Sequence, residues 1–276
     1  MQSTTIIVPC HNEAKRLQSR ELLSFASQHR EISFLMVNDG SGDNTQEMLE
    51  ELAAANPSQF TVKHLAQNCG KAEAVRRGIL QAARQQPDYM GFWDADLATP
   101  LDAILLFSAV FERRPEISLV IGCRLPLAGH EIRRQRLRAW LGRRFLTAAG
   151  LVLGHRFYDT QCGAKLFRAI PSVLAAFSQP FHSRWIFDVE LLARLRQLNE
   201  HQSRPALQQF VYELPLDSWV DVAGTKLKRS DFVKAFAELW AIWWRYRRPG
   251  ADRFVPAREF LDLATESPPP IKKKAA

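Results

Sequence analysis

The sequence lacks the long apolar runs from which membrane-spanning helices are made. A spanning helix needs about 18 or more consecutive apolar residues. The longest apolar stretches, 145–154 and 239–244, are far shorter. The chain does not open with a basic patch followed by an apolar core, so we also expect no signal peptide. We therefore predict a protein that can visit a bilayer surface but does not span it.

Cysteine is scarce and shows no metal-binding spacing. The four cysteines stand apart without a CxxC pair, at Cys10, Cys69, Cys123 and Cys162. This pattern indicates neither a zinc site nor a disulfide framework, and we expect reduced thiols in a cytoplasmic protein.

Two common nucleotide-binding signatures are also missing. Gly40 and Gly42 could begin a dinucleotide fingerprint, but Thr45 occupies the position of the third glycine. The chain contains no Walker A sequence either. These absences argue against a dinucleotide oxidoreductase and against a P-loop enzyme.

The composition is that of an ordinary globular protein with a surplus of positive charge. Of the 276 residues, 46% are hydrophobic and 24% are charged, which excludes a disordered chain, a disulfide scaffold and a collagen-like protein. Lys and Arg number 37 against 29 Asp and Glu, which gives a net charge of +8. Such a balance requires an anionic partner: nucleic acid, a nucleotide or phospholipid headgroups. The length fits one large domain or two small ones.

Short apolar runs alternate with helix-like stretches over the first 125 residues. The alternation predicts an α/β fold, with a mostly parallel, Rossmann-like sheet and helices on both faces. Ligands bind at the carboxyl ends of such strands, so the loops that follow the strands are the candidate site. The predicted strands are 5–8, 34–37, 60–65, 89–93 and 119–123, and the predicted helices are 45–55, 71–84 and 101–113.

Two aspartates, Asp94 and Asp96, follow the fourth predicted strand. In extended chain, side chains at positions i and i+2 share a face, so the two carboxylates converge. A hard divalent cation resolves their repulsion, and magnesium typically uses one or two protein carboxylates together with substrate phosphates. The alternative is a turn with two solvated aspartates, but the position at a strand end favours a metal site.

Asp39 ends the second predicted strand in a similar way. Its carboxylate could accept hydrogen bonds from a nucleobase or a ribose. The alternative is a helix-capping loop, because residues 43–45 (Asp-Asn-Thr) are typical helix caps.

The second half of the chain holds a basic stretch and an aromatic helix. Residues 133–144 contain six arginines and no acidic residue, which indicates either a solvated helix or a surface helix that faces phosphates. A final helix, 231–247, either packs on the core or lies at a membrane interface, and its trailing basic residues favour the membrane slightly. The wheel of this helix places Phe232, Phe236, Leu239, Trp240 and Trp243 on one face and Lys234, Glu238 and Arg245 on the opposite one.

Several motifs together resemble the family-two glycosyltransferases of the GT-A fold. They are IVPCHNE at 7–13, VNDGSGDNT at 37–45, Gly70-Lys71 and DAD at 94–96. Four stretches are most similar to dolichyl-phosphate glucosyltransferases and their bacterial polyprenyl-phosphate relatives: DADLATP at 94–100, DTQCGAKLFR at 159–168, RWIFDVEL at 184–191 and WVDVAGTKL at 219–227. The resemblance covers about residues 4 to 230.

The resemblance implies a nucleotide-sugar donor, with UDP-glucose expected, and a Mg²⁺ or Mn²⁺ ion. It also implies a polyprenyl or dolichyl phosphate acceptor. Ala98 stands where mannose synthases of the family often carry an amide metal ligand, so metal binding here would rely more on water and phosphate. The implied donor residues are Pro9, His11, Glu13, Asp39 and Lys71, the metal ligands are Asp94 and Asp96, and the acceptor-phosphate ligands are Arg124, Arg133 and Arg134.

A phosphate acceptor changes what the protein must supply. A phosphate monoester has a second pKa near ~6, so it is largely ionised at neutral pH and needs no general base. We therefore expect a direct, inverting displacement in which arginines position the acceptor. Asp188 and Glu190 would shape the acceptor side, although Glu190 fits equally well as a structural carboxyl buried in a helix.

Two other functions remain open at this point. One is transfer to a sugar hydroxyl, as in polysaccharide or glycoprotein synthesis, with Asp188 as the base. The other is an inactive, basic module that binds membranes. A nucleic-acid partner is not expected, because the basic residues accompany no groove-reading motif.

The sequence divides into three predicted parts. We expect residues 1–230 to form the GT-A domain, 231–250 an amphipathic helix that packs on the core or lies at a membrane interface, and 251–276 a flexible tail rich in Pro and Lys. We expect a cytoplasmic protein that associates peripherally with the anionic surface of the cytoplasmic face of a membrane.

Overall fold

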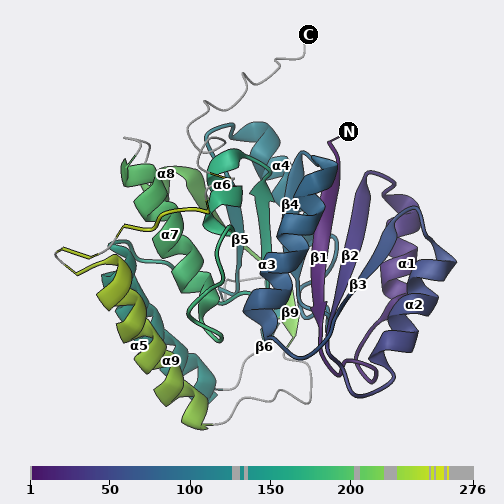
Figure 1. Ribbon diagram of the computed structural model, residues 1–276, viewed down its shortest axis with the longest axis horizontal. Helices are drawn as coiled ribbons and strands as arrows, with labels where there is room; N and C mark the ends of the chain where they lie inside the picture. The colour runs from purple at the N-terminus through teal and green to yellow at the C-terminus, as the bar shows by residue number, and fades with distance from the viewer. Residues whose placement is uncertain are drawn as a thin grey trace, which may run out of the picture.

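A computed structural model shows a seven-stranded sheet with the strand order β3-β2-β1-β4-β7-β5-β8 (Figure 1). It describes residues 2–125, 131–133, 136–201, 206–220, 229–248, 250–251, 253–257 and 260, with the backbone alone at 131–141, 143, 201 and 229–233. The strands are β1 (Thr4–Cys10), β2 (Ile32–Asp39), β3 (Phe60–Leu65), β4 (Tyr89–Trp93), β5 (Leu119–Cys123), β7 (Ala164–Arg168) and β8 (Val211–Pro215). A separate parallel pair joins β6 (Glu131–Arg133) to β9 (Ser218–Val220).

The sheet is parallel except at β7, which confirms the predicted class. β1 pairs in parallel with β2 and β4, whereas β7 runs antiparallel to both β4 and β5. Every residue of β4 and β5 is buried, as expected of strands covered on both faces. The strands predicted at 60–65, 89–93 and 119–123 are confirmed with their bounds.

Helices cover the sheet, and further helices pack together at one end of the molecule (Figure 1). α3 contacts β1 and β2 closely: a Cβ added at Gly78 would lie 2.5 Å from Cγ2 of Ile7. The helices are α1 (Ser19–Gln28), α2 (Thr45–Ala55), α3 (Lys71–Ala82) with the 3₁₀ turn η1 (Ala83–Gln85), α4 (Ala103–Arg113), α5 (Arg136–Leu153), α6 (Pro171–Ala176), α7 (Phe187–His201), α8 (Leu207–Phe210) and α9 (Arg229–Tyr246).

The last helix, α9, packs against α5 and α7 at the end of the molecule away from β3 (Figure 1). None of the helices within the described part of the chain is long and apolar enough to cross a membrane. The side chains of α9 that face the protein are Ala235, Leu239, Ile242 and Tyr246, all buried.

This packing corrects the predicted faces of α9. Of the predicted apolar face, Leu239 is buried, but Phe236 and Trp240 are 40% and 63% exposed. Glu238, predicted on the face opposite the apolar one, accepts a hydrogen bond from the Ser183 hydroxyl. The side chain of Phe232 lies outside the described residues. A buried stripe and an exposed aromatic stripe therefore run side by side along one helix.

Candidate active site at the carboxyl edge of the sheet

Asp94 leaves the end of β4 and is held by the segment that leads into β7. Its amide donates to the carbonyl of Gly163 at 3.0 Å. A Cβ added at Gly163 would lie only 1.8 Å from Oδ2 of Asp94, so this glycine leaves the space that the carboxylate fills. The turn continues to Leu97, which has a positive φ of 49°, an uncommon conformation for a residue with a side chain. Gly163, in the motif at 159–168, therefore belongs to the site.

The two aspartates of the DAD motif lie between two cations. Lys71 Nζ donates to Oδ1 of Asp94, and Arg16 Nη1 lies 3.9 Å from Oδ2 of Asp96. Burial and the charge of Asp94 raise the pKa of Asp96. Burial lowers the pKa of Lys71, but the charges of Asp94 and Asp188 outweigh this and raise it. The two carboxylates are thus close enough to repel each other, and their side chains remain 40% and 24% exposed.

Asp39 holds the loop that presents Lys71. Its Oδ1 accepts from the Cys69 amide at 2.7 Å, and its Oδ2 accepts from the Gly70 amide at 2.8 Å. Gly70 has a φ of 91°, a conformation that favours glycine, and α3 begins at the next residue. Asp39 therefore orders the start of α3, and its predicted contact with a base or ribose stays a prediction.

The loop after β1 meets the loops after β2 and β3. Nδ1 of His11 lies 2.9 Å from the carbonyl oxygen of Asp39, and its Nε2 lies 2.9 Å from the Asn68 side-chain amide. Pro9 lies in β1 opposite Val37. The structure thus brings Pro9, His11 and Asp39 to one edge of the sheet.

Glu13 reaches the DAD motif through Arg16, a residue to which the sequence reasoning assigned no role. Glu13 accepts two hydrogen bonds from the Arg16 guanidinium, at 2.8 and 2.5 Å. Gln18, another residue with no predicted role, donates from its side chain to the carbonyl of Asp96 at 3.2 Å. The sequence does indicate the pairing of Glu13 with Arg16, because the two opposite charges are three residues apart. The contacts with Asp96 depend on the fold.

Asp188 lies in the first turn of α7. Its Oδ1 accepts from Lys165 Nζ at 2.5 Å, and the two side chains are 6% and 0% exposed. Lys165 Nζ lies 5.2 Å from the centre of the Phe92 ring, and Lys71 Nζ lies 5.9 Å from the same centre. Glu190 is fully buried, in line with its structural alternative.

The structure describes the three predicted acceptor-phosphate ligands to different extents. Arg124 makes a two-point ion pair with Asp159, at 2.5 and 2.8 Å, and lies 5.0 Å from the centre of the Trp219 ring. Burial lowers the pKa of Arg124, but Asp159 raises it overall. Arg133 belongs to β6, although its side chain is not described, and Arg134 lies outside the described residues.

Arg184 is a further cation at this edge, to which the sequence reasoning assigned no role. A Cβ added at Gly70 would lie 3.5 Å from Nε of Arg184, so the guanidinium lies against the loop that Asp39 holds. The side chain is exposed, and no ion pair within the described part of the chain includes it. Its charge is therefore open to an anionic ligand.

The chemistry of the carboxylates decides which metal could bind here. Within the described ranges, no group of three or more His, Cys, Asp and Glu side chains could hold a metal ion. Two partly exposed aspartates fit a hard cation that completes its shell with phosphate oxygens and water, as magnesium does. Asp94 and Asp96 thus suit a metal that arrives with a diphosphate.

Comparison with known proteins identifies the family of this chain. Residues 5–171 match the family Glycosyl transferase family 2. The chain belongs to this family. The resemblance drawn from the sequence motifs is thereby confirmed, and the protein is a glycosyltransferase.

Relatives along most of the chain share one named activity. A dolichyl-phosphate beta-glucosyltransferase of Trichomonas vaginalis is 33% identical over 251 residues, which cover 86% of this chain and 69% of that protein. The dolichyl-phosphate beta-glucosyltransferase of Saccharomyces cerevisiae is 30% identical, over 85% of this chain and 72% of the relative.

A solved structure supports the fold. Glucosyl-3-phosphoglycerate synthase from Mycobacterium tuberculosis in complex with UDP superposes with a TM-score of 0.61 at 19% identity, over 88% of this chain and 80% of that one. The same enzyme was crystallised with Mn²⁺, UDP-glucose and phosphoglyceric acid. The likeness confirms the predicted GT-A fold.

Proposed function

We propose that this glycosyltransferase transfers glucose from UDP-glucose to a polyprenyl or dolichyl phosphate, with inversion at the anomeric carbon. The single observation that carries the choice of acceptor is the buried ion pair between Asp188 and Lys165. Transfer to a sugar hydroxyl would require a base, and Asp188, the expected base, is already held by a cation. An ionised phosphate needs no base, and the activity named for the relatives fits the same choice.

Each part of the site has a role in this reaction. A Mg²⁺ or Mn²⁺ ion bound by Asp94 and Asp96 would neutralise charge that develops on the departing diphosphate. Lys71 and Arg184 add fixed positive charge on the same side. An oxygen of the acceptor phosphate forms the new bond to the anomeric carbon as the bond to UDP breaks, with Arg124 near the acceptor. Fixed charges that need no rearrangement favour such a transition state.

The proposal includes a place in the cell. A lipid acceptor is confined to a bilayer, so the protein would act at the cytoplasmic face of a membrane as a peripheral protein. The net charge of +8 suits an anionic surface, because basic groups near such a membrane are attracted to it.

The test is a partition assay with labelled UDP-glucose, a polyprenyl phosphate and either Mg²⁺ or Mn²⁺. We expect the label in the lipid extract, and none there without the metal. Asp96→Ala should abolish transfer, whereas Asp102→Ala, a change at an exposed aspartate nearby, should leave it intact. Label that enters only water-soluble products would contradict the proposal and favour a sugar-hydroxyl acceptor. Parallel assays with other UDP- and GDP-sugars define the donor.

A further inference from the structure

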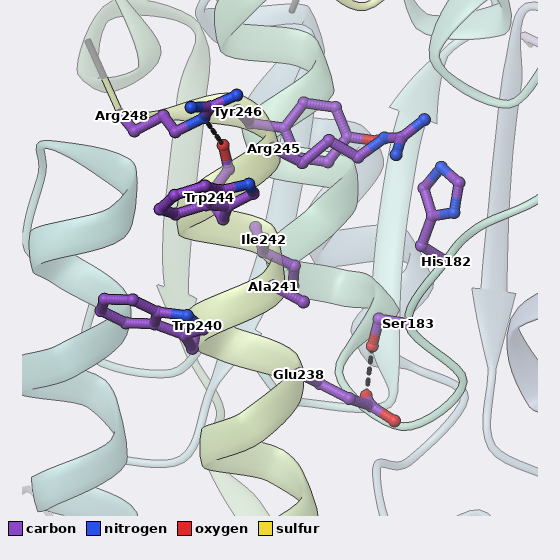
Figure 2. Close-up of a pocket in the computed structure, with 10 residues that line it drawn as sticks. All are labelled: His182, Ser183, Glu238, Trp240, Ala241, Ile242, Trp244, Arg245, Tyr246 and Arg248. Atoms are coloured by element: carbon purple, nitrogen blue, oxygen red, sulfur yellow. Dashed lines mark hydrogen bonds between the residues drawn. The ribbon is translucent and has the colours of Figure 1, made fainter. Parts of the chain in front are cut away.

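A groove of about 630 Å³ runs along the exposed side of α9, lined by residues that have no role in the proposed transfer (Figure 2). Figure 2 shows the Trp240 and Trp244 indoles on one side of the helix and His182 on the other, near the Arg245 guanidinium. Ala241 lies between the two sides, and its small side chain keeps the groove open. The groove therefore has an aromatic wall and a basic wall.

The aromatic wall belongs to a longer exposed stripe. Phe236, Trp240 and Trp244 are spaced by four residues, so they lie on one face of the helix, and they are 40%, 63% and 51% exposed. The Trp240 ring stacks on Trp243, with ring centres 5.0 Å apart. Monomeric soluble proteins rarely leave a large apolar patch uncovered. Indoles are suited to the boundary between water and hydrocarbon, because one edge is apolar and the ring N–H is polar.

The charges around the groove favour an anion. Arg245 is exposed, and no ion pair among the described residues includes it. Arg248 lies over the Trp244 ring, 4.3 Å from its centre, and donates to the Trp244 carbonyl. The one acid in the lining, Glu238, accepts hydrogen bonds from the Ser183 hydroxyl at 2.5 Å and from the Ile186 amide at 3.2 Å, so its charge is directed away from the arginines.

We propose that this groove binds an anionic phospholipid of the bilayer, with the lipid phosphate beside Arg245 and Arg248 and the indoles of Trp240 and Trp244 in the interface. An apolar stripe with a cation on either side of it matches an amphiphile with an anionic head. A small anion in solution would leave the stripe from Phe236 to Trp244 uncovered. None of the residues that line the groove has a role in the proposed transfer. The lipid site rests on the proposed function only in placing the protein at a membrane.

The test is co-sedimentation of the full-length protein with vesicles of phosphatidylcholine, with or without phosphatidylglycerol. We expect binding that requires phosphatidylglycerol and weakens with salt. Trp240→Ala combined with Trp244→Ala should weaken it by about tenfold or more, and Arg245→Gln with Arg248→Gln should remove the preference for phosphatidylglycerol. Leu106→Ala, a change at a 48% exposed residue of α4, is the matched control and should bind like the wild type.

Further arms separate the possible occupants. Tryptophan fluorescence should shift with vesicles but not with dissolved glycerol phosphate, and an equal shift with glycerol phosphate would overturn the lipid assignment. A wild type that fails to bind vesicles but forms a dimer, which Trp240→Ala dissociates, would assign the groove to a second copy of this chain. Asp96→Ala should bind vesicles normally, so loss of transfer and loss of lipid binding remain distinguishable. Unchanged vesicle binding by the α9 variants would also refute the proposal.

Discussion

The two halves of the chain differ in how far their ion pairs are exposed to solvent. In the N-terminal half, Lys71 and Asp94 lie at the sheet edge with side chains 39% and 40% exposed. In the C-terminal half, Glu190 and Arg194 form an ion pair whose side chains are 0% and 1% exposed. The first pair is open to an anion or a metal, whereas protein encloses the second. Similar residue types are therefore open to a ligand in one region and build the core in the other.

The enclosed charges of the C-terminal half connect segments that apolar contacts alone would not fix. Arg194 donates to the carbonyls of Gln179 and Pro180, each at 2.7 Å, and its guanidinium lies 4.4 Å from the centre of the Phe181 ring. Glu190 accepts from the Tyr246 hydroxyl at 2.9 Å, and burial and the charge of Glu190 raise the pKa of Tyr246 to about 12. One ion pair thus joins α7, α9 and the chain before α7.

The largest expected effect on activity is at the exposed charges. Asp94→Asn keeps the shape of the side chain but removes the charge that would hold a metal and Lys71. We expect kcat/KM for transfer to fall by about 10² to 10³-fold, with no loss of stability. Steady-state kinetics and urea unfolding of the same preparation measure both quantities. A loss of activity below tenfold would remove Asp94 from the proposed metal site.

Substitution of an enclosed charge should instead lower the free energy of unfolding. Arg194→Met leaves Glu190 buried without its cation, which typically costs about 3–5 kcal/mol in the free energy of unfolding. Urea denaturation measures this loss, and adding Glu190→Gln to Arg194→Met should restore part of it. If Arg194→Met unfolds at the wild-type urea concentration, the contrast between the halves does not hold.

A third change tests the point at which the halves meet. Gly163, in the C-terminal half, leaves room for the Asp94 carboxylate, so Gly163→Ala should displace that carboxylate. We expect activity to fall by about 10 to 100-fold, as for other changes that misplace a metal ligand, with little change in stability. Gly142→Ala is the matched control, since no atom of the described residues lies within 4 Å of a Cβ there. Equal activity of the two variants would mean that the backbone absorbs the change.

The N-terminal half could be predicted from the sequence because its signals are local. A strand buried on both faces is a continuous apolar run, and this identified β4 and β5 with their bounds. Asp94 and Asp96 follow such a run directly, so their place at the sheet edge followed from the pattern. α1 was not predicted, although its apolar residues Leu22, Phe25 and Ala26 face the core.

The C-terminal half could not be predicted to the same extent, because its signals are distant. β7 has a fully buried lysine, Lys165, at its second position, and a charge there hides the apolar run. The compensating Asp188 is 23 residues away in sequence. In α9, apolar residues occupy two neighbouring stripes, and the helical period alone does not say which stripe meets the protein. Only packing against α5 and α7 assigns Leu239 to the core and Trp240 to the surface.

The smallest expected effect is on stability, which the repulsion between the carboxylates of Asp94 and Asp96 lowers. Burial and the charge of Asp94 raise the pKa of Asp96, so the folded protein holds this proton more tightly than the unfolded chain does. The stability that this proton confers is present below the unfolded-state pKa and is lost as the pH rises through the raised pKa. In Asp96→Asn the side chain does not ionise, so this stability is not lost as the pH rises. Its melting temperature should equal that of the metal-free wild type at acid pH and exceed it near neutral pH by about 2–4 °C, the shift that 1 kcal/mol produces.

Thermal melts across this pH range, with and without Mn²⁺ and UDP, measure the difference. Asp94→Asn should behave in the same way, because it removes the charge that raises the pKa of Asp96. Metal with UDP should stabilise the wild type and neither variant, since a bound cation offsets the repulsion that the mutations relieve. A variant that melts below the wild type near neutral pH would mean that Asp96 stabilises the fold, and the exposed charges would then resemble the enclosed ones.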